Sequence, residues 1–123
     1  MTEINTKPKV VIDISKYRIR IHRTTIKALG NPGYVLLLVN PKEKIIGIIP
    51  TDRNDKQSHR IRYNGHSCEI YSMSFVETIG VLMDNFKVGN RYVIEGKVIS
   101  KKNLALFELG KAEIFNNELQ FAE

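Results

Sequence analysis

Cysteine and tryptophan are scarce in this chain: among 123 residues there is one cysteine, Cys68, and no tryptophan. A single thiol excludes an intrachain disulfide and is typical of the reducing cytoplasm, where we expect the protein to be located. No run of about 18 apolar residues occurs, so we expect no transmembrane helix. The N-terminus is polar and lacks the apolar centre of a secretory signal, so we interpret residues 1–8 as a flexible tail.

Signature motifs of catalysis are also missing. The sequence has no phosphate-binding P-loop, no dinucleotide-binding glycine fingerprint and no nucleophile elbow. The nearest approach to a metal site is His59, His66 and Cys68, but intervals of six residues and one residue match no common zinc spacing. We therefore expect no catalytic residues, no metal and no cofactor. A small enzyme that works at the mouth of a barrel is the alternative with least support.

Negative charge is scarce and unevenly placed. The chain carries 19 Lys and Arg against 13 Asp and Glu, a net charge of +6. Residues 1–62 hold 13 basic and 5 acidic residues, whereas residues 63–123 hold 6 and 8. A basic first half favours a polyanionic partner such as nucleic acid. The alternative is a coding bias toward lysine and isoleucine, which would raise the isoelectric point without any such partner.

One pattern occurs twice along the chain. Residues 18–50 predict a strand, a short helix and a β-hairpin, and residues 68–109 predict the same order. The corresponding positions are Ile19 and Ile21 with Cys68 and Ile70, Tyr34-Val35 with Tyr92-Val93, and the turn at 42–45 with the turn at 101–104. One such unit is too small to bury its own apolar face, so two units packed together would share a core.

The repeated pattern and the many short strands define the predicted fold class. We predict a single domain, residues 1–123, that is mainly β (α+β): a compact barrel of short strands with one short helix in each pseudo-repeat. The pseudo-repeats span residues 10–50 and 60–115, and a polar loop, 51–59, joins them. Residues 116–123 are acidic and only weakly periodic, and no packing role is predicted for them.

Helix boundaries are predicted from capping residues. Thr24 or Thr25 can cap the first helix, and Gly30 suits the left-handed position beyond its end. Residues 74–77, Ser-Phe-Val-Glu, match a capping box for a second helix that runs to about Asn85.

The sharpest chemical pattern is a strand that alternates between apolar and cationic residues. Residues 17–23 follow period two, which predicts one face in the core and one in water. Residues two apart on a strand are separated by about 7 Å, close to the spacing of phosphates along a nucleic-acid strand. The candidate phosphate contacts on this face and near it are Lys16, Arg18, Arg20, His22, Arg23, Lys27, Arg60 and Arg62. The alternative is a solvated sheet face whose charges prevent edge-to-edge aggregation.

The order of elements resembles that of cradle-loop barrels, in particular the swapped-hairpin transition-state-regulator family of DNA-binding proteins and the antitoxins similar to it. Residues 17–39 and 68–99 carry the resemblance, which concerns layout only. It implies two interlocking units and DNA-binding arginines on exposed strands, which Arg18, Arg20 and Arg23 match in type and placement. The family unit is a shorter chain that dimerises, whereas this chain holds both units. The sequence as a whole also resembles those of small proteins of bacterial mobile elements and phages.

These patterns predict a non-enzymatic nucleic-acid-binding protein, with transcriptional regulation as one role, that contacts phosphates through a basic strand face. Tyr63 beside Arg62 is the one aromatic residue placed to stack on a base. The alternative is a protein-interaction or structural module of a bacterial or phage complex. The expected partner is nucleic acid, DNA in the first place, or an acidic protein. We expect no membrane partner, and a homodimer is one available assembly.

Overall fold

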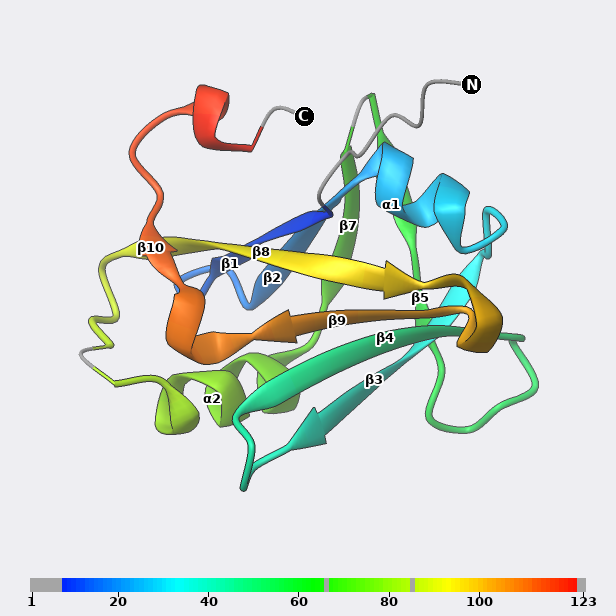
Figure 1. Cartoon of the computed structure of the whole chain (residues 1–123), viewed down its shortest axis with the longest axis horizontal. Helices are drawn as coiled ribbons and strands as arrows, with labels where there is room; N and C mark the ends of the chain where they lie inside the picture. The colour runs from blue at the N-terminus through cyan, green and yellow to red at the C-terminus, as the bar shows by residue number, and fades with distance from the viewer. Residues whose placement is uncertain (1–7, 66, 85, 122–123) are drawn as a thin grey trace.

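The computed structural model describes residues 8–65, 67–84 and 86–121 and is mainly β in them, which confirms the predicted class (Figure 1). The strands are β1 (Lys9–Asp13), β2 (Arg18–His22), β3 (Tyr34–Asn40), β4 (Ile45–Thr51), β5 (His59–Arg60), β6 (Arg62–Asn64), β7 (Ser67–Tyr71), β8 (Arg91–Ile99), β9 (Leu104–Glu108) and β10 (Glu113–Ile114). The helices are α1 (Arg23–Ala28) and α2 (Met73–Leu82), with 3₁₀ turns η1 (Ser100–Lys102), η2 (Leu109–Lys111) and η3 (Glu118–Gln120). Within the described ranges, neither α-helix has the length and apolarity needed to cross a bilayer.

The strands form one antiparallel sheet that closes almost completely into a barrel. Its order is β5-β3-β4-β9-β8-β1-β2-β7-β6, with β10 added beside β8. The two ends of this order, β5 and β6, are separated only by Ile61, whose N–H donates to the Gly33 carbonyl at 2.9 Å. The short piece of chain that forms β5 and β6 therefore pairs first with β3 and then with β7. This change of partner closes the barrel at a corner.

The two halves of the chain are arranged alike, and each completes the other. The order β2-α1-β3-β4 in the first half matches β7-α2-β8-β9 in the second. Equivalent strands pair with each other at β2·β7 and at β4·β9. The first strands are exchanged on one side only. Strand β1 pairs with β2 of its own half and with β8 of the second half. In the equivalent place, β6 pairs with β7 of its own half and β5 pairs with β3 of the first. Two pseudo-repeats, each with one short helix, are thus confirmed.

The hairpin turns repeat as predicted, but one strand alignment is out of phase. Lys44 and Asn103, each just before the second strand of its hairpin, have left-handed backbone with φ of 55° and 50°. Val35 points into the main core, whereas Val93 belongs to a second cluster on the outer side of the sheet. Tyr92, not Val93, shares the orientation of Val35, so the predicted match of these pairs is wrong by one residue.

One large apolar core fills the barrel, and a smaller cluster lies outside it. Ile19 and Ile21 of β2 are buried in the main core, as their alternation predicts. The smaller cluster consists of Val11, Val93, Phe115 and Phe121. The C-terminal segment therefore packs onto the outer side of β1 and β8, a role that the sequence did not predict.

Helix α1 begins two or three residues earlier than the predicted caps, Thr24 or Thr25, imply. Its N-cap is His22, whose Nδ1 accepts a hydrogen bond from the Thr24 N–H at 3.2 Å, so Thr24 and Thr25 lie inside the helix. Gly30 has φ of 89°, which confirms the left-handed position predicted beyond the helix end.

Helix α2 is capped by Ser72. The Ser72 hydroxyl accepts from the Phe75 N–H at 3.3 Å, so the capping box predicted at residues 74–77 is wrong. The helix ends at Leu82, and Asn85, its predicted end, lies outside the described residues.

Two predicted segment boundaries also shift. Pro8 was assigned to the tail, but it is buried and its carbonyl accepts a hydrogen bond from the Gly96 N–H at 2.8 Å. The rest of that tail, residues 1–7, lies outside the described residues. Thr51 and His59 belong to β4 and β5, so the polar loop between the halves is shorter than predicted.

Candidate functional site

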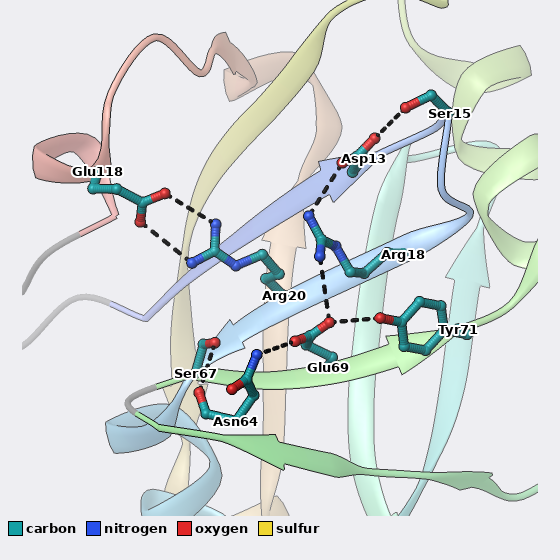
Figure 2. Close-up of polar contacts among 9 residues, drawn as sticks. All are labelled: Asp13, Ser15, Arg18, Arg20, Asn64, Ser67, Glu69, Tyr71 and Glu118. Atoms are coloured by element: carbon teal, nitrogen blue, oxygen red, sulfur yellow. Dashed lines mark hydrogen bonds and ion pairs between the residues drawn. The ribbon is translucent and has the colours of Figure 1, made fainter.

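Arg18, the first strand cation of the predicted basic face, is held between two carboxylates. Its guanidinium donates to Asp13 at 3.2 Å and to Glu69 at 3.4 Å (Figure 2). The Arg18, Asp13 and Glu69 side chains are 16%, 4% and 8% exposed. The second oxygen of Asp13 accepts from the Ser15 hydroxyl at 2.9 Å. A largely buried cation with two acidic partners is neutralised, so Arg18 is not free to bind a phosphate.

Glu69 is the centre of this polar network. Besides Arg18, it accepts hydrogen bonds from the Asn64 amide at 2.9 Å and from the Tyr71 hydroxyl at 2.7 Å (Figure 2). These two hydrogen bonds, with the charge of Arg18, lower the pKa of Glu69 below its ordinary value, although burial acts in the opposite direction. The carboxylate therefore stays ionised and holds β2, β6 and β7 together.

Arg20, the next cation of the face, is covered by the C-terminal segment. Both of its terminal nitrogens donate to Glu118 at 3.3 Å (Figure 2), and its guanidinium lies 4.9 Å from the centre of the Phe121 ring. His22 also contacts Phe121, with 5.5 Å between ring centroids, and its Nδ1 lies 3.0 Å from the Thr24 hydroxyl. The predicted row of free cations is therefore absent, because Arg18, Arg20 and His22 are engaged within the protein.

Arg23, at the start of α1, lies against the exposed Tyr63 of β6. Its guanidinium is 5.9 Å from the ring centre and donates to the Gly65 carbonyl at 3.3 Å. Tyr63 is 47% exposed, and its hydroxyl donates to the Pro32 carbonyl at 2.9 Å, which fixes the ring orientation. Burial raises the pKa of Tyr63, and the charge of Arg23 acts against it, so the hydroxyl remains protonated at neutral pH.

A second arginine–tyrosine pair lies on the other face of β6. The Arg62 guanidinium is 5.7 Å from the ring centre of Tyr71, which is 49% exposed. Arg62 and Tyr63 are consecutive in a strand, so their side chains point to opposite faces. We call Arg23, Arg62, Tyr63 and Tyr71 the arginine–tyrosine edge, because β6 ends the strand order of the sheet.

The three remaining predicted cations are exposed, and none has an ion-pair partner among the described residues. They are Lys16, Lys27 and Arg60. Lys27 is one helical turn beyond Arg23 and shares its side of α1. Lys16 lies in the turn before β2, not on the strand face where the alternation had placed it. Five of the eight predicted cations are thus accessible, and none of the five lies in β2.

The sequence interpretation missed the acids that neutralise this strand. Glu69 stands in the outward phase of β7, between inward Cys68 and Ile70, and that alternation was a usable signal. Phe121 was a second signal. A large aromatic ring at the end of a polar segment is stabilised by burial against an apolar surface, and in the structure that surface includes Val11.

Catalytic and metal-binding candidates gain no support from this geometry. In the described ranges, no group of His, Cys, Asp and Glu could hold a metal ion. His66, one of the three residues considered above, lies outside those ranges. Cys68 is buried, and burial raises the pKa of its thiol, which disfavours the reactive thiolate. Burial also lowers the pKa of His59.

Comparison with protein-family models, with curated proteins and with solved structures finds no match to this chain. The resemblance to the swapped-hairpin DNA-binding proteins therefore stays a prediction. Function is inferred below from the contacts and surfaces of the barrel.

Proposed function

We propose that the protein binds nucleic acid, without enzymatic activity, through the arginine–tyrosine edge. The observation that carries the proposal is the placement of two half-exposed tyrosine rings, each beside an arginine: Tyr63 of β6 beside Arg23, and Tyr71 of the neighbouring strand β7 beside Arg62. Stacking of a base on an aromatic ring contributes about 1–3 kcal/mol per base, and an arginine next to the ring binds phosphate. Because stacking needs unpaired bases, this surface suits single strands better than duplexes.

Further cations extend the proposed contact surface. Lys27 shares a side of α1 with Arg23, and Lys16 and Arg60 are exposed without an ion-pair partner in the described ranges. Together with the two arginines of the edge, these three lysine and arginine side chains give five accessible positive charges. Arg18 and Arg20 hold strands and the C-terminal segment in place and are not part of the contact surface.

We further propose that the nucleic acid is DNA, that the protein acts in transcriptional regulation and that it is located in the cytoplasm. The exchange of first strands between the halves supports the resemblance to swapped-hairpin DNA-binding proteins. The free thiol of Cys68 supports a reducing compartment.

Fluorescence anisotropy with labelled single-stranded DNA, RNA of the same sequence and duplex DNA tests the proposal over a series of salt concentrations. We expect single strands to bind more tightly than duplex, with affinity that falls steeply as salt rises. The variant Arg23→Ala plus Arg62→Ala removes two phosphate contacts and should flatten the logarithmic salt slope by about 1.4 for a single strand.

The matched control is Lys101→Ala plus Lys102→Ala, which removes the same charge from exposed lysines in the turn between β8 and β9. This control should bind like the wild type. No binding to any of the three nucleic acids at low salt would overturn the proposal. An equal loss in both double variants would reduce the effect to net charge and would also overturn the role of the edge.

A protein-interaction or structural module of a bacterial or phage complex is the second candidate. The aliphatic outward side of β3, β4, β8 and β9 favours this candidate, because an aliphatic surface suits a protein partner better than the charged backbone of a nucleic acid. Under this candidate, Leu38→Glu on this aliphatic side would weaken a protein complex, and nuclease treatment would leave the complex unchanged.

A further inference from the structure

The outward side of the four strands β3, β4, β9 and β8 is aliphatic. Residues directly paired across a ladder point to the same side of the sheet. Those on the outward side are Leu36, Leu38, Ile45, Ile49, Ile99, Leu104 and Leu106, which we call the outer aliphatic face. Their neighbours Ile46, Ile48 and Phe107 point into the core instead. None of the seven belongs to either apolar cluster; Leu38 is 42% exposed and the other six are half-buried.

On β1 and the first part of β8, by contrast, the outward valines are covered. Val11 and Val93 lie beneath Phe115 and Phe121 of the C-terminal segment. The two helices pack chiefly against β2 and β7 and leave the outer aliphatic face open. The strand sequences YVLLLVN and IIGIIPT of β3 and β4 are almost continuously apolar, which is typical of strands buried on both faces. A partner that covers the second face would account for this pattern.

One edge of the same sheet is open. Strand β3 pairs with β5 only at Tyr34 and Val35, and beyond them no described strand lies on that side. The Gly33 carbonyl accepts from Ile61 on this side, so the alternation of an antiparallel ladder directs the N–H and C=O of Leu37 and Val39 to the same side. An unpaired strand edge is a template for another strand.

A cleft of about 350 Å³ runs along this open edge, lined by residues 36–38 of β3, residues 56–58 of the neighbouring loop and His59 of β5. Exposed lysines surround the cleft and the outer aliphatic face. They are Lys42, Lys56, Lys97, Lys101 and Lys102, and none has an ion-pair partner in the described ranges. The acids nearby are Glu43, Asp52, Asp55 and Glu108, one fewer than the lysines. Three of them are engaged within the protein: Glu108 pairs with Lys111, Asp55 accepts from the Thr51 hydroxyl and Asp52 accepts from the Asn54 N–H. An apolar surface with a cationic rim is complementary to an acidic, amphipathic ligand.

The cationic rim argues against a second copy as the occupant, because face-to-face packing would bring like charges together. A membrane is also a poor fit. The outer aliphatic face consists of leucine and isoleucine side chains lying in a sheet, without the tryptophan or phenylalanine that interfacial segments insert into lipid.

We propose that the open edge of β3 binds an acidic, amphipathic segment of a partner protein, which adds to the sheet as an antiparallel strand beside Leu36 to Asn40. The backbone of Leu37 and Val39 pairs with this segment. Alternate aliphatic side chains of the segment extend the outer aliphatic face, and the acidic side chains between them meet Lys56 across the cleft. This site includes no residue of the arginine–tyrosine edge, so peptide binding here and nucleic-acid binding at the edge can be tested independently.

Selection from a random-peptide phage library tests the proposal, with counter-selection on the Val39→Pro variant. That substitution removes the edge N–H without removing a hydrogen bond to β4, since Val39 directs its backbone to the open side. We expect enriched peptides to alternate acidic and aliphatic residues. The affinity of a synthesised selected peptide should fall about tenfold or more in Val39→Pro and in Leu38→Glu. The matched control is Val81→Glu, which places the same charge on an exposed residue of α2.

Circular dichroism verifies that all three variants keep the fold. Enrichment of basic peptides, or of no sequence pattern, would overturn the proposal, as would equal affinity in wild type, Val39→Pro and Leu38→Glu. Sedimentation of the protein alone and with anionic vesicles completes the test. Self-association, or vesicle binding, that is lost in Leu38→Glu would replace the acidic peptide by a second copy or a membrane as the occupant.

Discussion

Truncation of Glu69 to alanine should destabilise the barrel strongly, because three donors lose their shared acceptor. Asn64, Tyr71 and Arg18 donate to Glu69 at 2.9, 2.7 and 3.4 Å. A hydrogen bond to a charged group contributes about 1.5–3 kcal/mol. Removal of one partner of a buried ion pair costs about 3–5 kcal/mol. Arg18 keeps Asp13 and some contact with water, so we expect the free energy of unfolding to fall by about 2–4 kcal/mol.

This loss is large enough to measure as a shift in melting temperature. An unfolding entropy of about 2.1 cal/mol/K per residue gives about 4 °C per kcal/mol for a chain of 123 residues. The variant should therefore melt about 8–16 °C below the wild type. Far-UV circular dichroism is the appropriate probe, since the chain has no tryptophan. The control is Glu118→Ala, whose carboxylate is 69% exposed and whose ion pair with Arg20 should contribute only about 0–1 kcal/mol.

A second variant separates the loss of the acceptor from the charge left behind. Arg18→Met in the Glu69→Ala background removes the cation that has lost its partner, so it should restore part of the stability. Losses for Glu69→Ala and Glu118→Ala that agree within about 0.5 kcal/mol would refute the assignment of Glu69 as the centre of a buried network.

Further outcomes concern pH, packing and capping. The pKa of Glu69 is lowered in the folded state, so the ionised carboxylate contributes fully to the free energy of unfolding above the ordinary pKa of 4.5. This contribution is lost as pH falls through the lowered pKa. The variant Glu69→Gln should therefore flatten the acid limb of a curve of stability against pH. Gly96→Ala would place a methyl 2.5 Å from the Phe107 ring and should destabilise by about 3 kcal/mol, whereas Gly33→Ala, with nothing within 4 Å, should change urea unfolding by less than about 0.5 kcal/mol. Ser72→Ala removes the N-cap of α2 and should cost about 1 kcal/mol in the same urea measurement.

The parts of the fold that depend on local sequence were predictable. The alternation around Ile19 and Ile21 located β2, and Gly30 located the end of α1. Strand β4 runs to Thr51, one residue beyond the predicted end of the first pseudo-repeat at residue 50, because Pro50 is tolerated within the strand, where it pairs with Val35 of β3. A proline that needs no ladder donor can continue a strand, and this depends on the partner strand, not on the local sequence.

The candidate site was harder to predict because its decisive contacts are distant in sequence. Arg18 and Glu69 are 51 residues apart, and Arg20 and Glu118 are 98 apart. The alternation of apolar and cationic residues correctly identified the outward side chains of β2. An outward side chain can still be occupied by an ion pair within the protein, as Arg18 and Arg20 are. Tyr71 shows the same limit, since its exposure beside Arg62 follows from the β6·β7 pairing, which no local pattern specifies.

The exchange of first strands has a consequence for proteolysis and folding. Each half contributes the strand that completes the sheet of the other, so neither half encloses a core alone. Cleavage within residues 52–58 would cut the covalent link but leave four strand ladders joining the fragments: β1·β8, β2·β7, β4·β9 and β3·β5. The nicked protein should persist as an interlocked complex that unfolds in one cooperative transition. Its assembly must also wait for the second half of the chain, because these ladders join segments distant in sequence.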